Sequence, residues 1–177
     1  MDLSGPIASL KASIRDVPDF PKPGIVFKDI TPLLGDPLAF RRAMDLLTVL
    51  CGDCGVDKVA AVESRGFIVG GVLAHRLGVG LVPVRKPGKL PARTVRASYE
   101  LEYGTDALEI HEDALSRGDR VLIVDDVIAT GGTARAVADL VERLGGQVSA
   151  YAFLVELTFL KGRDRLRGYD VLSLIRY

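Results

Sequence analysis

Residues 121–133 read VLIVDDVIATGGT, and this stretch decides the fold. The four aliphatic residues at its start are typical of a strand buried on both faces of a parallel sheet. Two adjacent acids, Asp125 and Asp126, follow at the expected carboxyl end of that strand. From Thr133 onward, apolar residues recur at helical spacing until Gly145, which predicts a helix that begins in the Thr/Gly turn.

The turn after the two acids has the composition of an anion site. Gly131 and Gly132 allow the backbone to approach a ligand closely, while Thr130 and Thr133 add donors at a helix amino end. The ionised acids accept hydrogen bonds and suit a vicinal diol one sugar length from a phosphate. This order of strand, acids and turn favours a sugar-phosphate site over the alternative, an ordinary strand-to-helix turn capped by the acids.

Composition restricts the class of protein. The 177 residues include 23 basic and 23 acidic side chains, and 48% of them are hydrophobic, which fits one enzyme-sized domain. A formal net charge of zero disfavours a general nucleic-acid binder. No apolar run is long enough to span a bilayer, and residues 1–10 lack the features of a signal peptide. We therefore expect a cytoplasmic protein without a nucleic-acid or membrane partner.

Cys51 and Cys54 form a Cys-x-x-Cys motif, which in other proteins binds zinc or carries out thiol redox chemistry. A redox pair requires its first thiol at a helix amino end, whereas this pair follows a helix predicted over residues 37–50. The two histidines, His75 and His111, are distant in sequence, so no zinc ligand set is complete. We interpret the two cysteines as structural.

Strand and helix patterns alternate along the chain, which favours a mostly parallel sheet covered by helices on both faces. The expected strands span residues 58–63, 81–84, 121–125 and 148–155, and a helix is expected over residues 67–77. Ligands of such sheets bind at the carboxyl ends of the strands. The predicted fold class is therefore α/β with its site at that edge.

A second strand-to-helix turn carries the residues Glu63, Ser64, Arg65 and Gly66. An arginine and a glycine at this position suit a second anion. The alternative is that Glu63 and Arg65 form a simple solvated ion pair.

The segment from residue 85 to residue 96 is basic and interrupted by prolines and a glycine. It shows neither helical nor strand periodicity, so we expect an exposed, mobile loop. Beside a sugar-phosphate site, its basic residues favour a lid that closes over the anionic ligand. The alternatives are a solvated charge run and a weak RNA-binding patch. The basic residues are Arg85, Lys86, Lys89, Arg93 and Arg96.

Residues 121–133 resemble the phosphoribosyl diphosphate (PRPP) motif of type I phosphoribosyltransferases. Three further stretches narrow the resemblance to the adenine phosphoribosyltransferase family over nearly the whole chain. They are residues 23–30, residues 85–91 together with 98–104, and residues 155–162. The phosphate loop of nucleoside triphosphatases and a GxGxxG after a strand are both absent from the sequence.

The resemblance implies the type I phosphoribosyltransferase fold in a single domain, residues 1–177. Within it, residues 1–35 would form a small base-binding hood and residues from about 85 to 104 a flexible lid. The implied reaction joins adenine to the phosphoribosyl group of PRPP, giving AMP and diphosphate in purine salvage. The implied cofactor is Mg²⁺, bound mainly through PRPP without direct protein ligands, and the implied assembly is a homodimer.

The resemblance also implies roles for individual residues. The PRPP and AMP contacts would be Asp125, Asp126, Ala129, Thr130, Gly131, Gly132 and Thr133. The diphosphate contacts would be Ser64, Arg65, Arg85, Lys86, Lys89 and Tyr103, with the neighbouring subunit's site as an alternative position for Arg85. The adenine contacts would be Val26, Phe27, Lys28 and Val127.

Glu102 and Arg65 are the expected catalytic residues, Glu102 by removing a proton from adenine. The neighbouring Glu100 is an alternative for that proton transfer. The chain departs from the common family pattern at Lys28, where arginine is more frequent, and at Pro87, where a basic residue is more frequent.

Two other functions fit the same sequence pattern. The first is phosphoribosyl transfer to another purine base, and the second is a PRPP-sensing regulator of the same fold. A regulator would ordinarily carry an added basic domain, for which this chain is too short and too neutral.

Overall fold

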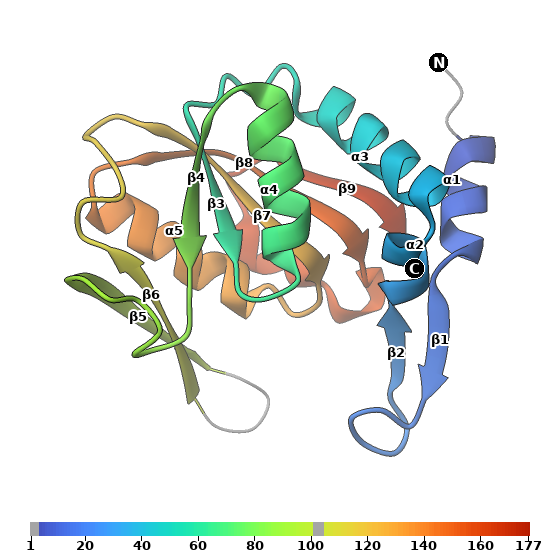
Figure 1. The fold of residues 1–177 in the computed structure, drawn as a ribbon. Coiled ribbons are helices and arrows are strands. Elements are labelled where there is room, and N and C mark those ends of the chain that lie inside the picture. Colours follow the sequence, from blue (N-terminus) through green and yellow to red (C-terminus); the bar gives the residue numbers. More distant parts are fainter. Residues whose placement is uncertain (1–3, 101–104) are drawn as a thin grey trace. The chain divides into compact units, whose positions relative to one another are not determined.

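The computed structural model describes residues 4–100 and 105–177 (Figure 1). The chain divides into two compact units, Met1–Leu46 and Leu47–Tyr177. The division falls within helix α3 (Pro37–Cys51).

The second unit is built on a five-stranded sheet in the order β4-β3-β7-β8-β9. Every neighbouring pair in this sheet is parallel, which confirms the predicted α/β class. The strands are β3 (Lys58–Val62), β4 (Gly80–Val84), β7 (Arg120–Ile128), β8 (Gln147–Glu156) and β9 (Val171–Arg176).

Two helices, α4 (Gly66–Leu77) and α5 (Gly132–Arg143), cover opposite faces of this sheet (Figure 1). Side chains alternate between the faces along each strand. Ala60 therefore joins the buried cluster that contains residues of α5, while the next residue, Ala61, lies under Gly70 of α4. Burial on both faces explains why these strands read as continuous apolar runs.

Strand β7 is longer than predicted. The expected strand ended at Asp125, but β7 continues to Ile128 because β8 pairs beside it as far as Glu156. Both acids therefore lie within the strand, whereas the expected strand ended at the first of them. Burial alternates along this last part, where Asp126 and Ile128 are buried and Asp125 is half-buried.

The basic segment is only partly a loop. Strands β5 (Thr94–Glu100) and β6 (Thr105–His111) form an antiparallel hairpin against α5. The prediction of irregular structure is therefore wrong for residues 94–96, because pairing with β6 supplies a regularity that their own sequence lacks. Residue 85 is also tied to β6 by two backbone hydrogen bonds with Glu109, at 2.9 and 2.7 Å.

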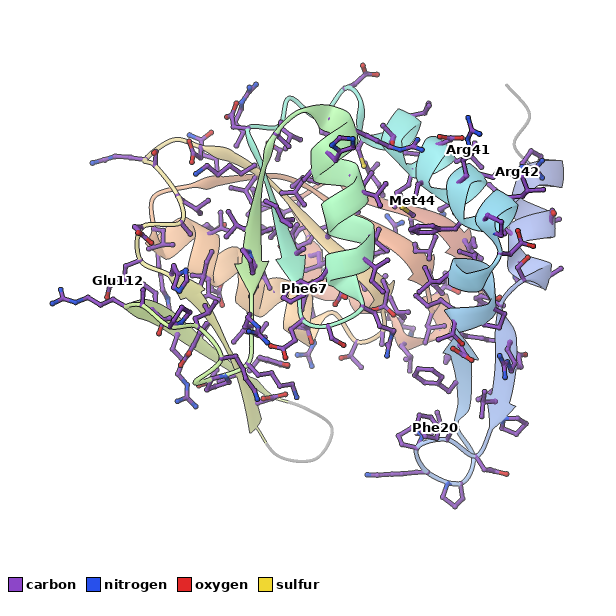
Figure 2. All side chains as sticks on the ribbon, in the orientation of Figure 1. Phe20, Arg41, Arg42, Met44, Phe67 and Glu112 are labelled. Carbon is purple, nitrogen blue, oxygen red and sulfur yellow. The ribbon has the colours of Figure 1, made fainter. Side chains whose placement is uncertain are left out.

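The first unit holds α1 (Ser4–Ala12), β1 (Arg15–Pro18), β2 (Val26–Asp29) and α2 (Thr31–Gly35). Strands β1 and β2 form a two-stranded antiparallel ribbon. Phe20 lies in the loop that joins them (Figure 2) and packs edge-on against Phe27, with 5.2 Å between ring centroids. Leu10, Ile30 and Leu33 are among the buried residues of this unit.

A pair of adjacent glycines tests the packing of α4 on β3. A Cβ on Gly70 would lie 2.5 Å from the Cβ of Ala61, whereas a Cβ on Gly71 would meet no atom within 4 Å. We expect Gly70→Ala to lower the free energy of unfolding by about 1–3 kcal/mol through overpacking. The control Gly71→Ala should raise it by about 0.5–1 kcal/mol through helix propensity. Urea denaturation measures both, and equal stability of the two variants would contradict the packing.

Candidate active site

The candidate site lies at the point where the order of strands in the sheet reverses. Strand β4 follows β3 on one side, whereas β7, β8 and β9 extend from β3 on the other side. In open α/β sheets, ligands bind at the carboxyl ends of the strands at such a switch point. In this chain, β3 and β7 are neighbouring strands. The turn after β3 carries Arg65, and it therefore lies next to the end of β7, where the two acids are.

An ion pair joins these two strand ends. The Nε of Arg65 donates a hydrogen bond to Oδ2 of Asp126. The Asp126 side chain is 7% exposed, while that of Arg65 is 43% exposed, so the guanidinium can also face a ligand. The alternative of a solvated pair between Glu63 and Arg65 is wrong, because Glu63 instead accepts a hydrogen bond from Arg85 at 3.1 Å.

Asp125 occupies a more restrictive environment. A Cβ on Gly66 would lie 2.8 Å from Oδ1 of Asp125, so a glycine is needed there for the two segments to approach. The same Oδ1 accepts a hydrogen bond from the backbone N–H of Asp126 at 2.8 Å. Burial and the negative charge of Asp126 raise the pKa of the Asp125 carboxyl well above its usual range.

The Thr/Gly turn leads directly into α5, as predicted. Gly131 has a φ of 81°, which favours glycine, and is the residue that precedes the helix. The first N–H groups of a helix lack intrahelical acceptors and bind anions. Within the described residues no side chain caps α5, so the alternative that the acids merely cap this helix is wrong.

The structure adds a residue to this turn that sequence reasoning missed. Gly162 begins the short 3₁₀ helix η2 (Gly162–Leu166), which follows η1 (Thr158–Leu160). A Cβ on Gly131 would lie 2.3 Å from the carbonyl oxygen of Gly162. Residue 162 belongs to a stretch that resembles the family, but the sequence contains no local signal for a contact with residue 131.

The basic loop before β5 is held by carboxylates of its own chain. Arg85 contacts Glu63, and its Nη1 donates to the carbonyl oxygen of Lys89 at 2.9 Å. Lys86 forms an ion pair with Asp106 of β6, with 3.1 Å between Nζ and Oδ2. Hydrogen bonding to Asp106 and its charge raise the pKa of the Lys86 amine. Glu102 and Tyr103 lie outside the described residues.

The residues expected to contact adenine come from both units. Val26, Phe27 and Lys28 form most of β2 in the first unit, and Val127 lies half-buried on β7 in the second. The Nζ of Lys28 contacts Oδ1 of Asp16 at 2.6 Å, so its amine already has a carboxylate partner. That pairing favours recognition of a base by the backbone of Lys28 over recognition by its side chain.

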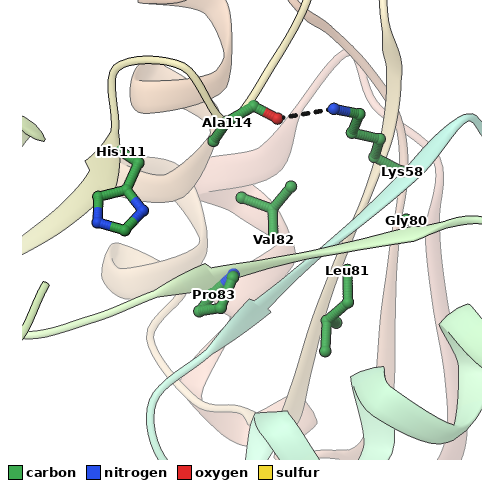
Figure 3. Close-up of a pocket in the computed structure, with 7 residues that line it drawn as sticks. All are labelled: Lys58, Gly80, Leu81, Val82, Pro83, His111 and Ala114. Atoms are coloured by element: carbon green, nitrogen blue, oxygen red, sulfur yellow. Dashed lines mark hydrogen bonds between the residues drawn. The ribbon is translucent and has the colours of Figure 1, made fainter. Parts of the chain in front are cut away.

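A separate pocket of about 190 Å³ lies along β4, beside the first residue of β3, and shares no lining residue with the candidate site (Figure 3). Its lining includes Lys58 and Gly80, the first residues of β3 and β4. The Nζ of Lys58 donates a hydrogen bond to the carbonyl oxygen of Ala114 at 2.8 Å, so this amine already has a partner within the protein. This pocket is therefore distinct from the site at the carboxyl ends.

The surroundings of the two cysteines disfavour a reactive thiol centre. Cys51, the last residue of α3, is buried, and both cysteines are free thiols. Burial and the nearby Cys54 raise the pKa of the Cys51 thiol to about 12. A raised thiol pKa disfavours the thiolate that redox chemistry and metal binding require.

Comparison with known proteins identifies the family. Residues 36–171 match the model of the phosphoribosyl transferase domain. An adenine phosphoribosyltransferase of Thermotoga neapolitana is 62% identical over 168 residues, which cover 95% of this chain and 99% of that protein. Within the described residues, no helix has the length and apolar character needed to cross a membrane.

Two solved structures agree with this assignment. The adenine phosphoribosyltransferase of Thermoanaerobacter pseudethanolicus has a TM-score of 0.95 and 58% identity, covering 97% of this chain and 99% of that one. The Saccharomyces cerevisiae enzyme, complexed with an imino-altritol bisphosphate and adenine, has a TM-score of 0.90 and 43% identity, with coverage of 97% and 99%. The chain therefore belongs to the adenine phosphoribosyltransferase family, which transfers the phosphoribosyl group of PRPP to adenine and releases AMP and diphosphate.

Proposed function

We propose that the switch point between β3 and β7 is the PRPP site of this chain. The observation that carries the proposal is the ion pair between Arg65 and Asp126, which joins the two strand ends where such folds bind ligands. The ribose hydroxyls would bind the carboxylates of Asp125 and Asp126. The 5-phosphate would bind the amides of the turn, residues Ala129, Thr130, Gly131, Gly132 and Thr133.

The diphosphate of PRPP would bind between the turn after β3 and the basic loop. Arg65 is half exposed beside Asp126, and Lys86 is 56% exposed, so both cations remain accessible to a ligand. Opposite charges at these places would stabilise the negative charge that grows on the departing diphosphate. The proposed diphosphate contacts remain Ser64, Arg65, Arg85, Lys86, Lys89 and Tyr103.

Adenine would be read by main-chain groups of β2. This strand pairs only with β1 among the described residues, so its other edge can offer backbone donors and acceptors to a base. We propose Val26, Phe27, Lys28 and Val127 as the base contacts, with the ring of Phe27 on one face of the purine. The engaged amine of Lys28 supports main-chain reading of a 6-amino group.

The reaction requires charge stabilisation on the leaving group and a place for one proton. As the bond from C1 of the ribose to diphosphate breaks, Arg65 and the lysines of the basic loop would hold the leaving oxygens while N9 of adenine attacks from the opposite face, with inversion. Glu102 is the proposed acceptor of the adenine proton.

The arrangement of the acids indicates how the proposed cofactor, Mg²⁺, would be held. Within the described residues no three His, Cys, Asp or Glu side chains gather to hold a metal ion, and Asp126 is already paired with Arg65. This donor set fits Mg²⁺ carried mainly by oxygens of PRPP, as the resemblance implies. Bound there, the ion would neutralise charge on the diphosphate.

We propose a cytoplasmic homodimer as the working form of this chain. The family resemblance supports this proposal. The intrachain contact of Arg85 with Glu63 favours a role for Arg85 in its own subunit over the alternative in the neighbouring one.

The first test is a panel of bases. Purified protein with PRPP and Mg²⁺ should convert adenine to AMP, and product chromatography should detect little product from hypoxanthine, guanine or xanthine. Asp126→Asn, which removes the carboxylate charge that Arg65 contacts, should lower turnover. Preferential use of a 6-oxo purine would contradict main-chain reading of adenine, and no turnover with any base would favour a PRPP-sensing regulator.

A second prediction separates stability from binding at Asp125. Because the folded pKa of Asp125 is raised, its contribution to stability is fully present below the ordinary value of 3.8 and is lost as the pH rises through the folded pKa. Asp125→Asn should therefore be more stable than the parent at pH 7, by a margin that vanishes at low pH. It should also bind PRPP at least about tenfold more weakly.

Urea denaturation from pH 4 to pH 8 and calorimetric titration measure the two effects of Asp125→Asn. Asp57→Asn is a control for which the change in stability has the opposite sign. A hydrogen bond from Arg120 lowers the pKa of Asp57, so replacing this carboxylate should destabilise the protein near neutral pH. A pH-independent difference between parent and Asp125→Asn would contradict the raised pKa.

A third prediction concerns Lys86 and its carboxylate partner. Lys86→Ala should weaken diphosphate binding by about tenfold or more. Asp106→Asn should strengthen diphosphate binding by up to about fivefold, because diphosphate then no longer competes with the Asp106 carboxylate for Lys86. In the double variant the gain should disappear.

Asp113→Asn is the matched control for Asp106→Asn, since it removes the same charge from the exposed turn after β6. Titration calorimetry with inorganic diphosphate in magnesium buffer measures all four variants. Equal gains from Asp106→Asn and Asp113→Asn would show a general charge effect and remove the specific competition.

A further inference from the structure

The proposed phosphate turn packs directly against the backbone of Gly162. A Cβ on Gly162 would lie 2.3 Å from the carbonyl oxygen of Ala129 and 2.8 Å from Cγ1 of Ile128. A Cβ on Gly131 would collide equally with Gly162. The position of the turn therefore depends directly on where Gly162 is held, since no flexible side chain separates the two segments.

The next residue, Arg163, fixes Gly162 through a forked ion pair. Its Nε lies 2.5 Å from Oε1 of Glu156, and its Nη2 donates to Oε2 at 2.8 Å. Its Nη1 donates to the carbonyl oxygen of Val171 at 2.8 Å, and Nη2 also donates to Oγ of Ser173 at 2.9 Å. One guanidinium thus ties η2 to the last residue of β8 and to the first half of β9.

Glu156 is a buried anchor for this arginine. Its side chain is 6% exposed and also accepts a hydrogen bond from the hydroxyl of Ser173, while Nε of Arg176 lies 3.2 Å from its Oε2. Burial alone would raise the pKa of the Glu156 carboxyl, but hydrogen bonds from Arg163 and Ser173 outweigh burial and lower it. The anchor is therefore an ionised carboxylate with several partners.

The anchor is also continuous with the turn along the sheet. Glu156 is the last residue of β8 and pairs in register with Ile128, the last residue of β7. The N–H of Leu157 then donates to the carbonyl oxygen of Ile128 at 3.0 Å. The hydrogen-bond network of Arg163 includes Glu156, and the turn follows Ile128, so the two are joined where β7 and β8 end. They are in contact a second time at Gly162.

We propose that Arg163 is a positioning residue for the 5-phosphate subsite, which it holds in shape through Glu156 and Gly162. The inference rests on the proposed function, because it takes the turn from Ala129 to Gly132 as the place where the 5-phosphate binds. Arg163 itself does not contact the ligand. Its role is to set the direction of the amides that do, and small displacements of such groups have large effects on binding and rate.

The test uses ligands that differ in their need for the turn. AMP and ribose 5-phosphate both carry the 5-phosphate, whereas inorganic diphosphate does not. In Arg163→Met, titration calorimetry in magnesium buffer should show AMP and ribose 5-phosphate weakened by about tenfold to a hundredfold. Diphosphate affinity should be unchanged, and the KM for PRPP should rise more than the KM for adenine.

Two further variants make the result specific. Arg167→Met is the control, because Arg167 directly follows η2 but pairs with Asp164 at 3.3 Å and is 82% exposed; all three affinities should stay at the parent level. Arg163→Lys keeps the charge without the planar fork, so it should recover part of the affinity for AMP. If Arg163→Met does not fold, Arg163→Lys provides the same comparison with a smaller expected loss.

Two results would overturn the inference. One is an unchanged AMP affinity in the folded Arg163 variants. The other is an equal loss of AMP and diphosphate binding, which would indicate a structural role for the whole site. Thr133→Ala tests the proposed function separately: if this direct change to the turn leaves AMP binding intact, the phosphate is elsewhere, and the proposed function fails independently of Arg163.

Discussion

The candidate site depends on the ion pair between Arg65 and Asp126. Parallel strand order alone brings the ends of β3 and β7 together, but it does not decide which charges meet there. Asp126 is almost completely buried, and a buried carboxylate without a partner is strongly unfavourable. Arg65 supplies that partner while keeping part of its guanidinium in solvent. One interaction thus stabilises the switch point and leaves a cation available for an anionic ligand.

Close backbone contacts give the same site its shape. Gly66 allows Asp125 to approach the start of α4, and Gly131 meets Gly162 without an intervening side chain. Packed interiors leave little space for adjustment, so contacts of this kind fix positions more firmly than contacts between long side chains. The proposed ribose and phosphate groups would therefore bind to a scaffold that is shaped before they arrive. We expect any adjustment on binding to occur at the exposed lysine side chains of the basic loop.

The sequence predicted those features that have a local cause. Buried parallel strands read as apolar runs, so the central strand and the turn after it could be recognised directly. Features that depend on a distant partner were missed or misplaced: β7 extends to Ile128 because β8 lies beside it, and residues 94–96 form a strand because β6 pairs with them. For the same reason the sequence offered only the nearby Arg65 as an alternative partner for Glu63, although the actual partner, Arg85, follows a whole helix and strand.

The two proposed diphosphate cations differ in how they can respond to a ligand. Arg65 pairs with a carboxylate that is 7% exposed, whereas Lys86 pairs with Asp106, which is 25% exposed. Separating the first pair would leave a buried charge uncompensated, so Arg65 should keep Asp126 and add the ligand. The second pair lies in a more solvated setting where an ion pair contributes little, so Lys86 can exchange Asp106 for diphosphate. Binding would therefore add a contact at one cation and replace a contact at the other, and the exchange at Lys86 reduces the net gain in affinity from its charge.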